Sequence, residues 1–497
     1  MILQGFYSCL TPMNLIVALA GTVSGLIIGA LPGLGASIAM TLALPLTFNW
    51  HPESALILLA SLYCSATYGG SISAILLNTP GTPASGATTF DGFPLAQKGE
   101  ADIALGLSTM ASFVGGIVGT ILLLTVAPLI TRVVLAFGPS QLFWIAVLSL
   151  FIIGALGEDM DKLLRGLLSC GFGLMLSFIG MDFFTGFRRF SFGNWYLVDG
   201  LNPTSLMIGC FAISEMLLLI EKGGDRVSEL ADPGSIRNVI KGCKKVFSYP
   251  VNLIRSSLIG SIIGAIPALG VMAASFLAYV AQVNSSKNPE SYGKGNYEGV
   301  VAPETANNAV TATAMIPTLT VGIPGSGAMV IVLGALTMHG LVPGPDLFNI
   351  NAGLVYTVMV SYFIINTLML VVGVLCAGYV SRITITPNRV LVPCVIVFCI
   401  IGAYALKGYW QDIVLTVIMG FVGYFMKKND YPSLGLLMGI ILGPITERSF
   451  HQALRISGGS YAIFYKGGIN IILIALIVML LLSPGIKKIM KRRAKTS

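Results

Sequence analysis

Long apolar stretches separated by short polar connections cover almost the whole chain. A run of about 20 apolar residues is long enough to cross a bilayer as one helix. Apolar spans, or pieces of spans, are expected near residues 14–31, 36–48, 56–77, 103–130, 141–156, 163–179, 205–220, 251–282, 353–380, 391–406, 413–425, 434–445 and 468–482. The pattern predicts an all-α polytopic membrane protein with about 10–12 transmembrane segments, since helices satisfy their own backbone groups in lipid.

Proline and glycine interrupt four of these stretches, near residues 32–35, 78–86, 267–270 and 317–327. The last interruption lies in a run from Thr305 to Pro345 that contains no Asp, Glu, Lys or Arg. Non-helical backbone is tolerated at membrane depth only where protein buries it or where it lines a wet cavity. We therefore predict broken or re-entrant helices at all four positions.

The four breaks form two matched pairs. The segment from Gly25 to Gly35 resembles the segment from Gly260 to Gly270, except that Ala268 replaces a glycine. Each segment precedes another apolar stretch that ends in its own proline-glycine break. Paired interruptions of this kind are typical of secondary transporters built from two related halves, which are commonly inverted repeats. A single proline-glycine pair would favour plain helix packing, but the matched set favours a binding site.

These features predict the organisation of the chain. The predicted parts are a first transmembrane half at residues 1–221, a cytoplasmic linker at 222–250, a second repeat core at 251–350, and C-terminal transmembrane helices with a basic cytoplasmic tail at 351–497. The linker is the longest hydrophilic stretch and is rich in Lys and Arg, which mark the cytoplasmic side of a membrane.

Composition supports the membrane assignment. Of 497 residues, 55% are hydrophobic and only 10% are charged, and the mean hydropathy is +0.85. The net charge of +8 is concentrated in short loops and in the tail, without the aromatic residues typical of a nucleic-acid surface. Basic residues next to the last apolar stretch predict a cytoplasmic C-terminus close to the lipid bilayer; they are Lys487, Lys488, Lys491, Arg492, Arg493 and Lys495.

The breaks also predict the kind of ligand. A helix that begins inside the membrane has amide N–H groups without intrahelical partners, and these groups and the helix dipole favour an anion. Hydroxyl and amide side chains nearby would add donors. The predicted substrate-binding residues are Asn78, Thr79, Gly81, Thr82, Ser85, Asn307, Asn308, Gly325, Ser326 and Gly327.

A cation is expected beside the anion. Carbonyl groups freed around Gly33, Gly35 and Gly270, with Ser37 nearby, are predicted to bind a hard cation such as Na⁺. Asn307 and Asn308, next to the second break in the sequence, are candidates for contact with the substrate or an ion, and the alternative is that they merely join two helices by hydrogen bonds. Glu304 is expected at the membrane interface, where a charge is inexpensive, with a proton or cation role as the lesser alternative.

Other functional classes are disfavoured by the sequence. The eight cysteines form no Cys-x-x-Cys pair and the three histidines are far apart, so no metal site is predicted beyond Na⁺. The chain contains no His-Glu-x-x-His, no Gly-x-Ser-x-Gly and no phosphate-binding Gly-x-x-x-x-Gly-Lys-Ser/Thr motif. An enzyme is therefore not predicted, and no cofactor is expected apart from a coupling cation, Na⁺ or H⁺.

Several motifs together resemble the large membrane subunit of the tripartite tricarboxylate transporters, the TctA family. They are Gly29-Ala-Leu-Pro-Gly-Leu-Gly-Ala36, Tyr68-Gly-Gly-Ser-Ile-Ser-Ala-Ile-Leu-Leu-Asn-Thr-Pro-Gly81, Phe90-Asp-Gly-Phe-Pro94, Tyr292-Gly-Lys-Gly295, Ala302-Pro-Glu-Thr-Ala-Asn-Asn-Ala309 and Gly322-Ile-Pro-Gly-Ser-Gly327. The resemblance extends over nearly the whole chain, and Ala268 is its one noted departure.

The resemblance implies a permease in the bacterial inner membrane. Such a permease works with a small membrane subunit and a periplasmic solute-binding protein, and it imports tricarboxylates or related organic carboxylates by symport with a cation. The residues alone predict only a secondary carrier for an anion. The alternatives are a stand-alone ion-coupled carrier for another small anion and, ranked lower, a channel.

Overall fold

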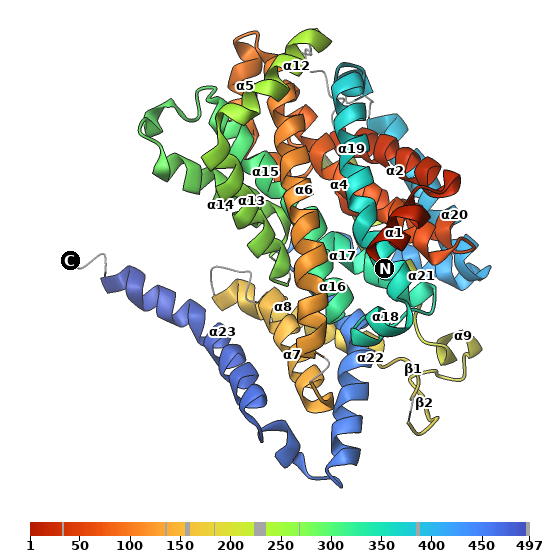
Figure 1. Ribbon diagram of the computed structural model, residues 1–497. Helices are drawn as coiled ribbons and strands as arrows, with labels where there is room; N and C mark the ends of the chain where they lie inside the picture. The colour runs from red at the N-terminus through yellow and green to blue at the C-terminus, as the bar shows by residue number, and fades with distance from the viewer. Residues whose placement is uncertain are drawn as a thin grey trace. The chain divides into compact units, whose positions relative to one another are not determined.

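The computed structural model describes residues 1–31, 34–134, 137–154, 160–182, 184–222, 235–267, 269–383 and 388–493. Within these ranges the chain is almost entirely helical (Figure 1). The two strands, β1 (Gly180–Met181) and β2 (Arg188–Arg189), are two residues long and pair antiparallel. The predicted all-α fold is confirmed.

The chain divides into two compact units, each made of two separate segments. Unit 1 contains Met1–Thr131 and Phe211–Gly408, and unit 2 contains Arg132–Cys210 and Tyr409–Ser497. The predicted part boundaries at residues 221, 250 and 350 stay a prediction. Most of the predicted linker, residues 223–234, lies outside the described residues.

The first segment of unit 1 contains α1 (Ile2–Cys9), α2 (Pro12–Ala30), α3 (Gly35–Ala43), η1 (Leu44–Thr47), α4 (Pro52–Leu77), η2 (Pro83–Gly86), α5 (Thr89–Gln97) and most of α6 (Ala101–Val134). The second contains α11 (Ser214–Lys222), α12 (Ile236–Lys245), η4 (Val246–Ser248), α13 (Pro250–Ala265), α14 (Gly270–Ser285), η5 (Pro289–Ser291), α15 (Tyr297–Thr313), α16 (Met315–Thr320), α17 (Gly327–Met338), α18 (Pro345–Ile350), α19 (Ala352–Ile383) and α20 (Asn388–Lys407).

Unit 2 is built mainly from α7 (Pro139–Gly154), α8 (Met160–Ser177), α9 (Trp195–Val198), α10 (Pro203–Met207), α21 (Trp410–Lys428), α22 (Ser433–Ile456), η6 (Tyr461–Phe464) and α23 (Gly468–Arg493); a π-helical segment, Ile208–Ile213, continues α10 into α11. Glycines bring α8 and α22 into close contact, since a Cβ on Gly173 would lie 2.0 Å from the carbonyl oxygen of Leu436. Small residues at a helix–helix contact allow membrane helices to approach each other closely.

The apolar helices identify a multi-pass membrane protein. Among the described residues, five helices are long and apolar enough to cross a membrane: Pro12–Ala30, Pro52–Leu77, Ala101–Val134, Pro203–Glu221 and Ala352–Cys376. A sixth candidate is the pair Ile236–Ser248 and Pro250–Ala265, which is bent by 85°. Shorter apolar helices, such as Gly327–Met338, accompany them. The estimate of ten to twelve spans stays a prediction.

The two halves of unit 1 repeat one packing arrangement. In the first half α2 packs along α4, and in the second half α13 packs along α15. A Cβ on Gly25 of α2 would lie 2.9 Å from the carbonyl oxygen of Leu62 in α4, and one on the matching Gly260 of α13 would lie 2.3 Å from that of Ala306 in α15. The matched glycines noted in the sequence therefore serve the same close helix crossing in both halves, while the inverted relation of the halves stays a prediction.

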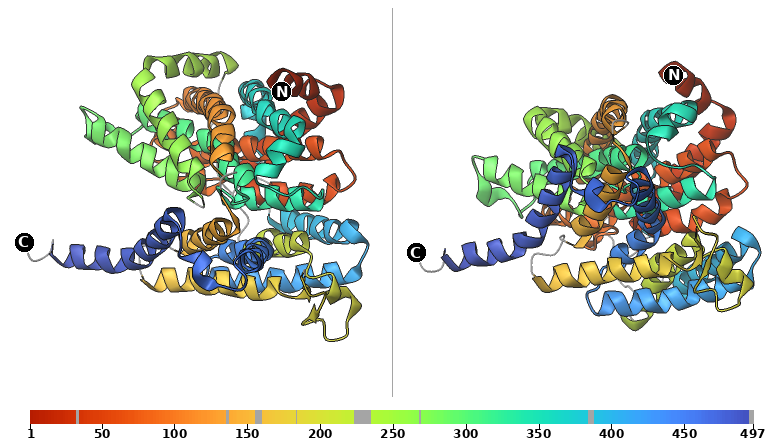
Figure 2. Two further views of the ribbon diagram at one scale, coloured as in Figure 1. Left: turned by 60° about the horizontal axis from the view of Figure 1, so that its bottom comes forward. Right: turned by 90° about the horizontal axis from the view of Figure 1, so that it is seen from below.

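Helix α6 lies between helices of the second half (Figures 1 and 2). A Cβ on Gly115 would lie 1.9 Å from the carbonyl oxygen of Thr305 in α15, and one on Gly116 would lie 1.9 Å from the side-chain oxygen of Asn366 in α19. Only glycine fits at Gly115, where the neighbouring atoms are backbone, while any larger residue at Gly116 would have to displace the Asn366 side chain. This contact brings the polar face of α6 against the middle of α15.

Candidate functional site

The first proline-glycine break follows α4. The helix ends at Leu77, and Asn78 adopts a left-handed conformation with φ 53°. The amide of Gly81 donates to the carbonyl of Gly70 at 3.1 Å. A Cβ on Gly81 would lie 2.1 Å from the carbonyl oxygen of Gly29, so the break packs against the end of α2. The predicted interruption of the helix is confirmed.

The predicted ligand residues of this break differ in exposure. Asn78 and Thr79 are exposed, whereas Gly81, Thr82 and Ser85 are buried. The Ser85 hydroxyl donates to the Thr82 carbonyl at 2.8 Å, and the pair forms a reciprocal cap at the start of η2. Their side chains are therefore engaged in holding the turn itself.

The second proline-glycine break separates α16 from α17. Gly322 has φ 78°, the left-handed conformation that Asn78 adopts in the first half. The amide of Gly325 donates to the Thr318 hydroxyl at 3.3 Å, and the Ser326 hydroxyl lies 2.9 Å from the Tyr63 hydroxyl of α4. Gly325 and Ser326 are buried and Gly327 is half-buried.

The start of α17 is open to an acceptor. Ser326 is its N-cap residue, with extended backbone, but the Ser326 side chain makes no capping hydrogen bond. Its hydroxyl is paired with Tyr63 instead. A helix of 12 residues begins here with its first amides uncapped by that side chain, which is the arrangement that favours an anion.

The two shorter breaks begin α3 and α14. Gly35 and Gly270 have φ 62° and 71°, a conformation that favours glycine. Gly33 and Ala268 lie outside the described residues. A Cβ on Gly270 would lie 3.9 Å from the Cβ of Ser326, so the two breaks of the second half meet. Assignment of Gly33, Gly35, Ser37 and Gly270 to a cation stays a prediction.

The halves also contact each other reciprocally. Helix α3 of the first half packs on α17 of the second, and α14 of the second packs on η2 of the first. The ring of Phe276 in α14 contacts Gly86 of η2, since a Cβ there would lie 3.2 Å from the ring. The structure therefore brings the described parts of all four breaks into one region of unit 1.

Two buried amides on α15 have unused hydrogen-bonding capacity. Asn307 and Asn308 are fully buried. Among the described residues, neither polar atom of the Asn307 side chain has a partner, and the Asn308 side-chain oxygen has none either. The Asn308 side-chain nitrogen lies 3.2 Å from the sulfur of Met369. A buried unpaired amide costs about 1–3 kcal/mol, so these groups are candidates for contact with a ligand.

Glu304 is not at the membrane interface, and that expectation was wrong. Its side chain is fully buried in unit 1 and accepts hydrogen bonds from four hydroxyl groups, here called the hydroxyl cage. The cage consists of Ser71 at 2.6 Å, Ser108 at 3.0 Å, Ser112 at 3.0 Å and Thr88. The close contact between α6 and α15 at Gly115 brings Ser108 and Ser112 to the carboxylate.

Sequence patterns gave little sign of this cage. Ser108 and Ser112 lie one helical turn apart on α6, which is a usable signal, but Ser108 is 196 residues from Glu304. Such pairs depend on tertiary packing, which hydropathy does not report.

Asp91 explains two of the sequence motifs. It is fully buried and accepts hydrogen bonds from the amides of Gly295 at 2.9 Å and Asn296 at 2.7 Å, and from the Tyr279 hydroxyl at 3.0 Å. Burial raises the pKa of nearby Tyr292, so its phenol stays protonated and donates to Glu298. The Phe90–Pro94 and Tyr292–Gly295 motifs therefore hold α5 to the loop before α15.

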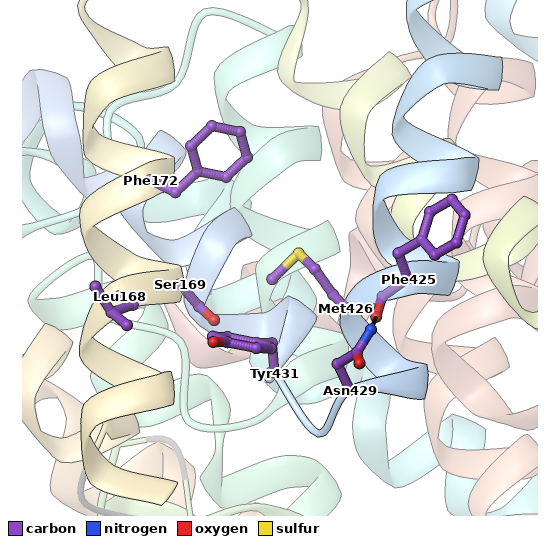
Figure 3. Close-up of a pocket in the computed structure, with 7 residues that line it drawn as sticks. All are labelled: Leu168, Ser169, Phe172, Phe425, Met426, Asn429 and Tyr431. Atoms are coloured by element: carbon purple, nitrogen blue, oxygen red, sulfur yellow. Dashed lines mark hydrogen bonds between the residues drawn. The ribbon is translucent and has the colours of Figure 1, made fainter. Parts of the chain in front are cut away.

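An apolar pocket in unit 2 contains none of the predicted site residues. Its walls come from α8 and α21 and from two residues shortly after α21 (Figure 3), and its lining residues are Leu168, Ser169, Phe172, Phe425, Met426, Asn429 and Tyr431. The side-chain nitrogen of Asn429 donates to the carbonyl of Phe425 at 2.8 Å. The pocket therefore offers mainly apolar contact.

Comparison with known proteins agrees with the motifs. Residues 15–444 match the family described as "Tripartite tricarboxylate transporter TctA family". A protein of Agrobacterium vitis, named "Uncharacterized 52.8 kDa protein in TAR-I ttuC' 3'region", is 34% identical over 486 residues, which are 97% of this chain and 96% of the relative. A second Agrobacterium vitis protein, "Uncharacterized protein in TAR-II ttuC' 3'region", is 34% identical over 231 residues, 46% of this chain and 96% of the relative. No solved structure matches the chain.

Proposed function

The chain belongs to the tripartite tricarboxylate transporter TctA family, and from this premise we propose that it imports tricarboxylates or related organic carboxylates by cation-driven secondary transport. As a permease component of such a transporter, it acts with other subunits. Those subunits are a small membrane protein and a periplasmic solute-binding protein that delivers the substrate. The bacterial inner membrane is its location, with the basic C-terminal end on the cytoplasmic side.

The observation that carries this proposal is the unpartnered side-chain amide of Asn307 on α15, the helix that precedes α16 and the second break. Asn307 is fully buried with no partner for either polar atom among the described residues. Gly270 at the start of α14 lies next to Ser326 at the start of α17. Helix starts supply amide donors and positive dipole ends, and the Asn307 side chain supplies a further donor. This combination suits the binding of a carboxylate and does not require a buried Arg or Lys beside it.

The first break supplies a second, more indirect contribution. Thr82 and Ser85 hold η2 in place, and η2 packs against α14. We therefore assign the second break and Asn307 to direct substrate contact, and the first break to positioning them. Gly33, Gly35, Ser37 and Gly270 remain in the proposal as residues around two helix starts: Gly35 and Gly270 begin α3 and α14, and Ser37 lies in the first turn of α3.

Uptake by the complete transporter tests the proposal. Cells expressing the chain with its partner subunits are given labelled tricarboxylates, dicarboxylates and an inorganic anion. We expect accumulation of organic carboxylates that collapses when the cation gradients are dissipated. Accumulation without the partner subunits would favour a stand-alone carrier, and downhill flux with single-channel currents would favour a channel.

One substitution ties transport to the site. Asn307→Leu removes an amide donor to a charged ligand, which is worth about 1.5–3 kcal/mol, so the KM should rise roughly 10- to 150-fold. Thr305→Val is the matched control, because Thr305 is buried on the same helix and its hydroxyl donates to the Val301 carbonyl at 2.8 Å. Equal KM values for Asn307→Leu and the control would remove Asn307 from the site.

A further inference from the structure

A buried carboxylate surrounded by hydroxyl groups lies at the junction of the two halves of unit 1. We propose that Glu304 binds the monovalent cation that drives uptake, with the hydroxyl cage supplying the remaining oxygen ligands. This inference rests on the proposed cation-driven transport and names the residue that couples the cation to it. The cation is H⁺ or Na⁺, and both share the chemistry of neutralising this carboxylate.

The cage is assembled from distant parts of the chain. Ser71 lies on α4, Thr88 lies between η2 and α5, and Ser108 and Ser112 lie one turn apart on α6. One carboxylate oxygen of Glu304 accepts from Ser71 and Thr88, and the other accepts from Ser108 and Ser112. An ionised carboxylate accepts about four hydrogen bonds, so these donors match the charged form.

The cage lacks a positive charge. The ion pairs recorded among the described residues involve Arg165 and Arg189, and none includes Glu304. A buried ionised group without a countercharge is unfavourable even when it is hydrogen-bonded. Binding of a proton or Na⁺ removes that cost, and each hydroxyl oxygen retains lone pairs with which to contact a hard cation.

Other ionisable groups on the helices packed against α15 form hydrogen bonds with partners other than Glu304, and among them the Tyr68 phenol also lies close enough to Glu304 to interact with it electrostatically. Tyr63 is hydrogen-bonded to Ser326, Cys64 to Asn366 and Tyr68 to Thr109. Asp91 accepts hydrogen bonds from Gly295, Asn296 and Tyr279. Arg255 donates to Gln282. Glu53 of α4 accepts a hydrogen bond from the Ser8 hydroxyl, and Asp102 at the start of α6 accepts one from the backbone amide of Ile103. Glu304 is therefore the acid that this cage surrounds.

The position of the cage links the cation to the substrate site. The amide of Thr88 donates to the carbonyl of Ser85 at 3.1 Å, so Glu304 is two hydrogen bonds from η2. Asn307 and Asn308 lie one turn farther along α15. Neutralising Glu304 removes a buried negative charge near the place where the carboxylate arrives, and this gives reciprocal coupling between cation and substrate.

The variant Glu304→Gln tests the inference in the complete transporter. It keeps the size of the side chain and removes its charge. We expect gradient-driven accumulation to fall at least about 100-fold, which is the scale of strong coupling between two sites. Exchange of internal for external substrate, which needs no net cation movement, should continue at a rate near that of the unmodified chain. Glu298→Gln on the same helix is the matched control and should keep both activities.

Two further measurements keep the inference falsifiable if Glu304→Gln fails to insert. The double variant Ser108→Ala and Ser112→Ala keeps the carboxylate but removes two hydroxyl groups of the cage. It should raise the half-saturating cation concentration about tenfold. Replacing Na⁺ with choline at fixed pH identifies the cation: loss of uptake indicates Na⁺, and unchanged uptake with dependence on a pH gradient indicates H⁺.

The outcomes separate this inference from the proposed function. If the unmodified chain transports no organic carboxylate, the proposed function fails. If it transports one and Glu304→Gln retains the same cation dependence, the inference alone is overturned. Loss of exchange together with accumulation, in a correctly inserted Glu304→Gln variant, would also overturn it, because that result assigns Glu304 to the substrate rather than to the cation.

Discussion

The first and second proline-glycine breaks of unit 1, near residues 78–86 and 317–327, begin alike and end differently. Each starts with a left-handed residue, Asn78 or Gly322, and continues through proline and glycine to a hydroxyl residue, Thr82 or Ser326. The first leads into η2, a turn of four residues, and the second leads into α17, a helix of 12 residues. A longer helix contributes a full dipole and uncapped amides at its start, which a short turn does not.

The surroundings of the two breaks differ in the same sense. Asn78 and Thr79 are exposed, whereas residues 322–326 are all buried. The Thr82 and Ser85 side chains form hydrogen bonds within their own turn, and the hydroxyl of Thr88, two residues after that turn, donates to Glu304. Ser326 instead reaches across to Tyr63 of the first half. The comparison fits the proposal in which the second break contacts the anion and the first connects that site to the buried carboxylate.

The largest expected effect comes from filling the second break. In Gly325→Leu the new side chain meets Ala314, because even a Cβ would lie 2.7 Å from its Cα atom. Overpacking of this kind costs about 1–3 kcal/mol or more and should displace Ser326, so uptake should fall below detection. Gly171→Ala is the control, since that glycine has open space around it. Labelled-substrate uptake, normalised to the inserted protein, measures the effect; normal uptake by Gly325→Leu would contradict a tight second break.

A smaller effect should distinguish the hydroxyl residues of the two breaks. Ser326→Ala removes a donor beside the proposed anion and should raise the KM about tenfold, as expected for roughly 1.4 kcal/mol. Thr82→Ala should leave the KM nearly unchanged and lower the free energy of unfolding by about 1 kcal/mol, because it removes a cap. Uptake kinetics and thermal unfolding measure the two quantities. Equal KM shifts in both variants would show that the breaks have the same role.

The phenol of Tyr63 should contribute less. Tyr63→Phe keeps the ring and removes the hydroxyl that lies 2.9 Å from Ser326. Loss of one neutral hydrogen bond costs about 0.5–1.5 kcal/mol, so the KM should rise roughly 2- to 12-fold. In a Ser326→Ala background the same change should have little further effect, because the two hydroxyls act as a pair. Additive losses in the double variant would contradict that pairing.

The smallest effect is expected at the exposed start of the first break. Thr79→Ala should change the KM by less than about twofold, since surface substitutions usually alter energies by no more than 0.5 kcal/mol. This result would separate Thr79 from the buried residues with which the sequence grouped it. A tenfold change would instead return the first break to direct substrate contact.

The sequence was sufficient for features that are local. Proline and glycine identified the breaks at 78–86 and 317–327, and matching glycines identified the related helix pairs, because backbone restrictions act within a few residues. The buried position of Glu304 depends on hydroxyls from three other parts of unit 1, so hydropathy placed this residue wrongly at an interface. The division into two units was also not predicted, because the apolar helices of both have similar composition.

Substrate protection of a single introduced thiol tests the central claim most directly. Gly327→Cys and Thr79→Cys are each made in a chain carrying Cys376→Ala and Cys394→Ala, since the other six native cysteines are buried whereas Gly327 is half-buried and Thr79 is exposed. Saturating organic carboxylate should slow alkylation of the thiol at position 327 by about tenfold or more and leave that at position 79 unchanged. Equal alkylation rates at position 327 with and without substrate would contradict an anion site at the second break.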